Sequence, residues 1–161
     1  MMNKKILAIV TLVIVLVIIG VIFWSNGKNK NVQINIDELS DKIAQSGAFE
    51  DELIKADSEM VKKDYNFTND EIKELVSFQG SGATSEEIVV LQVNDKSNLN
   101  TVKEKINTRI DERKEAFASY LPKEVFKIEN NVLKIQGNYV ILCISNDSKK
   151  VSDVINNYIK E

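Results

Sequence analysis

The stretches Ile88-Val-Val-Leu-Gln-Val93 and Tyr139-Val-Ile-Leu-Cys-Ile144 decide the fold of this 161-residue chain. Both are rich in β-branched and other apolar residues and have the length of strands, so we expect one strand in each. A turn-rich segment precedes each stretch, and before it lies another apolar segment, at residues 75–79 and 132–136. The sequence therefore predicts two β-hairpins, the second closed by Gly137-Asn138.

An amphipathic helix is predicted after each hairpin. The first begins at Ser97 or Asn98 and ends near Pro122. Its apolar residues recur at helical spacing and form one stripe, made of Leu99, Val102, Ile106, Ile110, Phe117 and Leu121. The second begins at Asp147 or Ser148 and turns Val151, Val154, Ile155 and Tyr158 inward.

The two hairpin-helix units resemble each other in sequence. Val76-Ser-Phe-Gln-Gly80 is similar to Leu133-Lys-Ile-Gln-Gly137, and the two decisive stretches also align. Chance similarity of two hairpins is the alternative to a repeat, and the fold class does not depend on it. We expect an α+β fold: a two-layer sandwich in which two β-β-α units form a four-stranded antiparallel sheet with both long helices on one face.

Short helices are expected before the first hairpin. Residues 36–47 have a possible N-cap at Asp37 and a stop at Gly47. One or two helices are predicted within the acidic, amphipathic residues 49–66. Thr68-Asn69-Asp70 predicts the start of another, which would carry Ile72 and Leu75.

The N-terminal part of the chain predicts a membrane anchor. Ile6–Trp24 contains 19 residues without a charge, and a helix of that length spans about 28 Å, close to the hydrocarbon core of a bilayer. A cleaved signal peptide is the alternative, but the run exceeds the usual apolar region of about 7–15 residues and no A-x-A site follows. We therefore divide the chain into a transmembrane signal anchor at 1–25, a linker at 26–31 and an α+β domain at 32–161.

The orientation of the anchor follows from its short N-terminal tail. Lys4 and Lys5 precede the run, while Lys28 and Lys30 follow it, so the lysine count is equal on the two sides. A five-residue tail that stays inside is the common arrangement of an N-terminal signal anchor. We expect a single-pass protein of the cell membrane with a cytoplasmic N-terminus and the domain outside.

Composition excludes several function classes. The chain has no histidine, so no imidazole can act as base or metal ligand, and one cysteine forms no intrachain disulfide. Beyond residue 30 there are 17 basic and 24 acidic residues, a net charge of −7. This field repels nucleic acid and anionic headgroups. We expect no nucleic-acid partner.

Three segments resemble a known family. They are Gly80-Ser-Gly-Ala-Thr-Ser-Glu-Glu-Ile88, the helix end Tyr120-Leu-Pro-Lys-Glu-Val125 with Arg109 and Phe117 before it, and the hairpin Ile135-Gln-Gly-Asn-Tyr-Val-Ile-Leu-Cys-Ile-Ser-Asn-Asp147. Over residues 34–160 the chain is similar to domain-of-unknown-function family 4358. The resemblance implies a small, anchored or lipidated envelope protein of a low-GC Gram-positive bacterium, and it implies no activity. A lipid anchor would need a cysteine after the apolar run, and the chain has none there.

Arg109 and Arg113 are the candidate site residues, because a cation beside the apolar stripe of a helix must be paired or reach solvent. Glu86 and Glu87, at the start of the second predicted strand, are the predicted partners in an ion pair that ties helix to sheet. The alternative is an anionic ligand held between the two arginines and the loop Gly80–Ser85.

No catalytic, metal or cofactor motif accompanies these residues. Gly80–Ser85 has the small residues of a phosphate-binding loop without its GxxxxGK[ST] spacing, and turn chemistry explains it. Cys143 is expected to be a buried apolar side chain. We therefore expect a protein that binds or organises another envelope protein and is not an enzyme. The alternative is a small anionic-ligand-binding or enzymatic module that uses Arg109, Arg113 and Gly80–Ser85.

Overall fold

The two decisive stretches form the central strands of the sheet, β3 (Glu87–Val93) and β5 (Tyr139–Ile144). They pair antiparallel, with Glu87 opposite Ile144 and Gln92 opposite Tyr139. Every residue of both strands is buried. A strand buried on both faces has no polar face, so the sheet needs a layer of packing on each side.

The computed structural model describes residues 33–160, which belong to one compact unit. The predicted anchor Ile6–Trp24 and the linker lie outside the described residues. Within residues 33–160, none of the helices combines the length and the apolar character needed to cross a bilayer.

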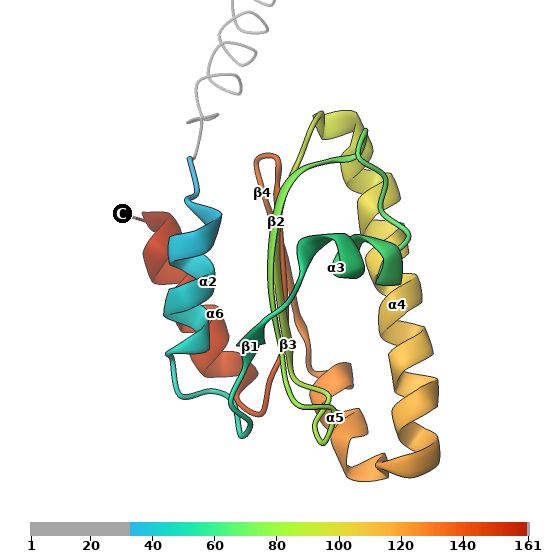
Figure 1. The fold of residues 1–161 in the computed structure, drawn as a ribbon. Coiled ribbons are helices and arrows are strands. Elements are labelled where there is room, and N and C mark those ends of the chain that lie inside the picture. The colour runs from blue at the N-terminus through green and yellow to red at the C-terminus, as the bar shows by residue number, and fades with distance from the viewer. Residues whose placement is uncertain (1–32, 161) are drawn as a thin grey trace, which may run out of the picture. The chain divides into compact units, whose positions relative to one another are not determined.

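The sheet has five antiparallel strands in the order β1-β2-β3-β5-β4 (Figure 1). β2 (Ile72–Gln79) and β4 (Val132–Gln136) form the predicted hairpins with β3 and β5. β1 (Ile54–Lys55) adds a two-residue edge beside Phe78 and Gln79. Gly137 has a φ of 63°, which suits the first position of the two-residue turn between β4 and β5.

One face of the sheet is covered by three helices, and this face is called the α4 face below. α4 (Leu99–Tyr120) lies along it, with α3 (Ser58–Asp64) and α5 (Val125–Glu129) beside it (Figure 1). The predicted apolar stripe of α4 faces the sheet, with Val102, Ile106 and Phe117 buried. They pack on a core that includes Val89, Leu91, Val140, Leu142 and Ile144.

The opposite face, called the α6 face, is covered by α2 (Ile36–Ala44) and α6 (Ser148–Lys160). Leu39 and Ile43 of α2 and Val151 and Ile155 of α6 are fully buried. Their core includes Val76, Ile88, Val90, Ile141 and Cys143, so successive residues of β3 and β5 belong to alternate cores.

The prediction of a two-layer sandwich with four strands is wrong. The sheet has five strands. The domain has three layers, because β3 and β5 direct apolar side chains to both faces of the sheet and helices must cover each face. The helices of the two β-β-α units lie on opposite faces (Figure 1), so the units are not related by a two-fold axis. Asp147 N–H donates to the Ala48 carbonyl at 3.1 Å, which directs α6 toward the end of α2.

The short N-terminal elements also differ from the prediction. α2 is capped by Asn35, whose side chain accepts a hydrogen bond from Glu38 N–H at 3.1 Å, and not by Asp37. Residues 49–66 contain β1 and α3. Ile72 and Leu75 belong to β2 and not to a helix, because both side chains pack in the α4-face core, and pairing with β3 outweighs the local capping signal.

Ile141→Ala and Leu142→Ala test the three-layer packing. These neighbours face opposite cores and are both fully buried. We expect each variant to lower the free energy of unfolding by about 2–5 kcal/mol, because each leaves a cavity in a separate core. Urea denaturation of the full chain measures both. A loss in only one of the two variants would contradict cover on both faces.

Candidate functional site

Arg113 of α4 lies against the start of the central strand β3. Its Nη2 donates to the Ser85 carbonyl at 3.0 Å, and its Nε lies 3.6 Å from Oε2 of Glu87. Glu87 is 1 % exposed, and Gln79 of β2 donates to its other carboxylate oxygen at 3.1 Å. The structure therefore brings Arg113 and Glu87 together in an ion pair between helix and sheet.

Arg109 lies one turn earlier on α4 and has different neighbours. Its guanidinium nitrogens are 4.0 Å from Asp64 and 3.9 Å from Glu112, both partly exposed. The guanidinium lies 6.0 Å from the ring centroid of the buried Tyr65. The ion-pair partners of Arg109 are therefore Asp64 and Glu112, and not the predicted Glu86 or Glu87.

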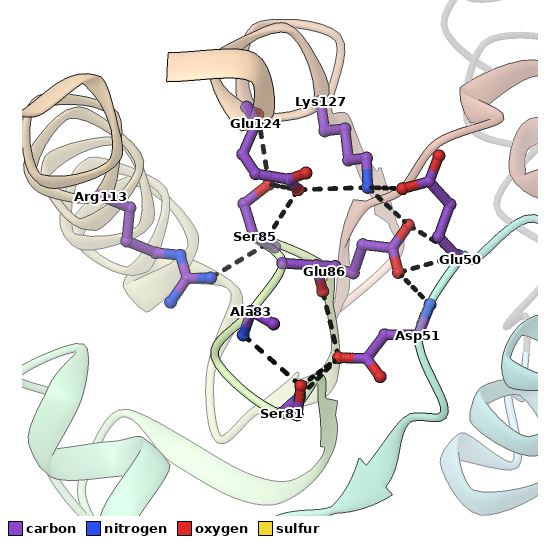
Figure 2. Close-up of polar contacts among 10 residues, drawn as sticks. Glu50, Asp51, Ser81, Ala83, Ser85, Glu86, Arg113, Glu124 and Lys127 are labelled. Atoms are coloured by element: carbon purple, nitrogen blue, oxygen red, sulfur yellow. Dashed lines mark hydrogen bonds and ion pairs between the residues drawn. The ribbon is translucent and has the colours of Figure 1, made fainter. Parts of the chain in front are cut away.

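Glu86 belongs to a third arrangement, centred on the buried amine of Lys127 in α5 (Figure 2). Lys127 Nζ lies 3.2 Å from Glu86, 3.1 Å from Glu124 and 2.8 Å from Glu50. The side chains of Lys127, Glu86 and Glu124 are at most 3 % exposed. We call these four residues the Lys127 cluster.

Backbone groups complete the Lys127 cluster. The N–H groups of Glu50 and Asp51 donate to the Glu86 carboxylate at 2.9–3.0 Å, and Ser85 N–H donates to Glu124 at 3.0 Å. The cluster therefore joins the segment after α2, the start of β3 and α5. This arrangement satisfies the buried charges, which would otherwise be strongly unfavourable.

The Lys127 cluster could not be recognised from the sequence. Glu124 precedes Lys127 by one helical turn, which is the only local signal. Glu86 and Glu50 are 41 and 77 residues away from Lys127 in the chain. Their approach depends on the three-layer packing, which the sequence analysis did not predict.

The loop Gly80–Ser85 surrounds a carboxylate of the same chain. Oδ2 of Asp51 accepts hydrogen bonds from Ser81 N–H and Ser81 Oγ, both at 2.7 Å, and from Thr84 Oγ1 at 3.4 Å (Figure 2). A Cβ at Gly80 would lie 2.7 Å from Thr84 Oγ1 and 3.0 Å from Asp51 Oδ2. A larger residue at Gly80 would therefore force the Thr84 or Asp51 side chain to move, and the loop is occupied by Asp51.

The hollow beside Arg109 does not extend to Arg113 or to the loop Gly80–Ser85. It measures about 70 Å³ and is lined by residues of α3, α4 and the segment between α3 and β2, namely Asp64, Tyr65, Asn66, Lys105, Thr108, Arg109 and Glu112. Small-molecule sites usually measure about 300–1,000 Å³. This hollow is too small for a metabolite, and neither Arg113 nor Gly80–Ser85 contributes to it.

Other titratable groups are held in unreactive states. Burial, and then the charge of Glu87, raises the pKa of the Tyr65 phenol well above its ordinary value. The same two causes, in that order, raise the pKa of the buried Cys143 thiol, so the thiolate that would react is disfavoured. Within residues 33–160, no group of carboxylates and thiols is arranged to hold a metal ion.

Comparison with known proteins gives one match. The family described as "Domain of unknown function (DUF4358)" matches residues 45–145. The chain belongs to this family. Neither a curated protein nor a solved structure matches it.

The DUF4358 region contains the whole Lys127 cluster, Arg113, Glu87 and the loop Gly80–Ser85. It begins directly after α2, ends just after β5, and leaves all of α2 and all of α6 outside. The match is narrower than the range 34–160 over which the resemblance was noted. The polar contacts at the start of β3 are therefore part of the DUF4358 region, whereas both helices of the α6 face lie outside it.

The Lys127 cluster stabilises opposite charges on its members. Burial alone raises the pKa of Glu124, but the hydrogen bond from Ser85 N–H and the ion pair with Lys127 outweigh it and leave the pKa below 4.5. Burial alone lowers the pKa of Lys127, but its bonds to Glu50, Glu124 and Glu86 outweigh burial and raise the pKa above 10.5. Glu124 and Lys127 are therefore both charged at neutral pH.

Lys127→Met tests how much the Lys127 cluster contributes to the stability of the fold. We expect the free energy of unfolding to fall by about 3–5 kcal/mol, because Glu86 and Glu124 would remain buried without a cation. The matched control is Lys114→Met, which removes an exposed lysine paired with Glu129 on the same side of the sheet and should change stability little. Urea denaturation of the full chain compares the two. Equal losses would contradict this role of Lys127.

The pH dependence of stability follows from the same pKa shifts. The pKa of Glu124 is lower in the folded chain than its ordinary value of 4.5, so its contribution is present above pH 4.5 and is lost as the pH falls through the folded pKa. The contribution of Lys127 is lost as the pH rises through its raised pKa, above 10.5. Urea denaturation across this range should show both declines, and Glu124→Gln should flatten the acidic one. An unchanged acidic decline in that variant would contradict the assignment.

Proposed function

We propose that this chain is a single-pass membrane protein whose domain, from residue 32 onward, binds or organises another protein of the cell envelope. The support for the anchor is the uncharged run Ile6–Trp24, which has the length of a bilayer-spanning helix. The position of the domain outside the cytoplasm is part of this proposal. Membership of DUF4358 adds no activity.

The observation that supports the binding role is that the polar groups of the candidate site already have partners within the chain. Arg113 is bonded to Ser85 and Glu87, Lys127 to three glutamates, and the loop Gly80–Ser85 to Asp51. A ligand-binding module would present such groups to solvent or to a cavity. Here they hold the helices to the sheet, which favours a structural role for them and recognition through the outer surface.

The outer surface carries side chains suited to a protein partner. Large apolar residues are exposed on both edge strands, on α3 and around α5: Ile54 at 69 %, Met60 at 64 %, Tyr120 at 57 %, Phe126 at 47 % and Ile135 at 39 %. Aromatic rings and methionine are enriched at protein interfaces. The net charge of −7 beyond residue 30 disfavours nucleic acid and anionic lipid as partners of the domain.

Protease treatment and crosslinking of intact cells test this proposal on the full chain. We expect external protease to digest the domain while a cytoplasmic marker protein stays intact, and the chain to sediment with membranes. An amine-reactive crosslinker that does not enter cells should join the lysine-rich domain to a second, reproducible envelope protein.

Each part of the proposal has its own contrary result. Resistance of the domain to protease until the cells are lysed would contradict the orientation. Recovery of the chain in the aqueous fraction would contradict the anchor. Crosslinks to copies of the chain alone would contradict a separate partner.

A further inference from the structure

Within residues 33–160, strand β4 is the outer strand on one side of the sheet and pairs only with β5. Its five residues pair in an uninterrupted register, from Val132 opposite Cys143 to Gln136 opposite Tyr139. It contains no proline and no bulge, two of the features by which proteins block an open sheet edge. The other edge carries β1, which has only two residues.

The backbone of β4 offers hydrogen-bonding groups away from the sheet. In an antiparallel pair, alternate residues direct their N–H and C=O groups toward the partner strand. Because the turn has two residues, the backbone groups of Gln136, Lys134 and Val132 point toward β5 and bond to it. The N–H and C=O groups of Leu133 and Ile135 therefore point outward, and within residues 33–160 no hydrogen bond reaches them.

The side chains of β4 give this edge a chemical pattern. Leu133 packs partly on the α4-face core, and Ile135, which points to the same face, is 39 % exposed. Lys134 points to the α6 face, where its amine bonds the side-chain oxygen of Asn156. The edge thus presents two apolar residues on one face and one cation between them on the other.

We infer that β4 receives an extended segment of the partner protein as a sixth strand, an inference that rests on the proposed binding role. The segment would bond the outward groups of Leu133 and Ile135. Opposite residues of paired strands lie on the same face, so the segment needs apolar residues facing Leu133 and Ile135 and an acidic residue facing Lys134. Its recognition pattern is apolar, acidic, apolar.

A second copy of this chain fits the edge poorly. Two β4 strands that pair antiparallel over all five residues are centred on Lys134, and this register places the two Lys134 side chains directly opposite each other. Like charges in that position are destabilising. Shifting the register by the two residues that backbone pairing requires leaves only part of the strand paired. The Lys134 charge therefore selects a different chain.

Amide hydrogen exchange measured by NMR on the full chain in detergent micelles tests the inference. The probes are two five-residue capped peptides, each with valines on both sides of a central glutamate or a central lysine. We expect the glutamate peptide at millimolar concentration to slow exchange of the Leu133 and Ile135 amides at least about threefold, because strand pairing protects them. The lysine peptide should not slow it.

Variants at β4 sharpen this test. Ile135→Pro removes an outward N–H and should abolish protection at Leu133, whereas the matched control Ile135→Thr keeps the N–H and should retain it. Should Ile135→Pro fail to fold, Lys134→Glu serves instead and should reverse the preference from the glutamate to the lysine peptide. Equal protection by both peptides, or none, overturns the inference. Slow exchange of these amides in the absence of peptide also overturns the inference. If the protection grows with protein concentration, a second copy of the chain covers β4. If it does not, another segment of the same chain covers β4.

A photoreactive residue in the full chain in intact cells separates this inference from the proposed function. Placed at position 135, it should crosslink a segment with the apolar, acidic, apolar pattern. Placed at position 60 instead, it should give the same crosslinks with and without Ile135→Thr. Crosslinks to another protein from Met60 or Tyr120 but not from Ile135 would overturn the β4 site and leave the proposed function standing. No crosslink to another protein from any of the three positions would overturn both.

Discussion

Two strands without a polar face determine how the rest of the domain is built. β3 and β5 lie side by side in the middle of the sheet, and every side chain of both is buried. Alternate residues belong to different cores, so neither face can be left to water. This requirement explains why α4 and α6 follow similar hairpins and yet cover opposite faces, and why α2 is needed beside α6. The outer strands, which are less buried, complete the sheet without setting its layers.

Polar contacts at one end of β3 hold these layers in register. Glu86 and Glu87 are neighbours in sequence and engage different elements: Glu86 contacts Lys127 of α5 and the backbone after α2, and Glu87 contacts Arg113 of α4. Buried ion pairs are weak contributors to net stability but are costly to break, so such contacts favour one arrangement of helices over others. The same contacts use the groups that could otherwise bind a ligand. This is why we propose that the domain recognises its partner through the outer surface and the open edge of the sheet.

Prediction from the sequence worked where the signal was local. The hairpins, the stripe of α4 and the last helix follow from spacings within one segment, and they match the structure. At the candidate site, the sequence predicts Arg113 and Glu87 because a cation beside an apolar stripe needs a partner, and the structure places their side chains 3.6 Å apart. Lys127 was not named, because its partners Glu50 and Glu86 come from distant segments. For residues 68–75 the local capping signal predicts a helix, but the strand found from Ile72 onward depends on pairing with the distant β3.

The sequence by itself determined the two hairpins, the amphipathic helix that follows each of them, the membership of DUF4358 and the absence of imidazole chemistry, because each depends on residue types and their spacing along the chain. Only the tertiary structure decided the number of layers, the position of Lys127 among three carboxylates and the occupation of the Gly80–Ser85 loop by Asp51. It also decided that β4 is an outer strand with outward backbone groups. These features depend on which segments meet in space, and the burial of β3 and β5 on both faces sets that arrangement.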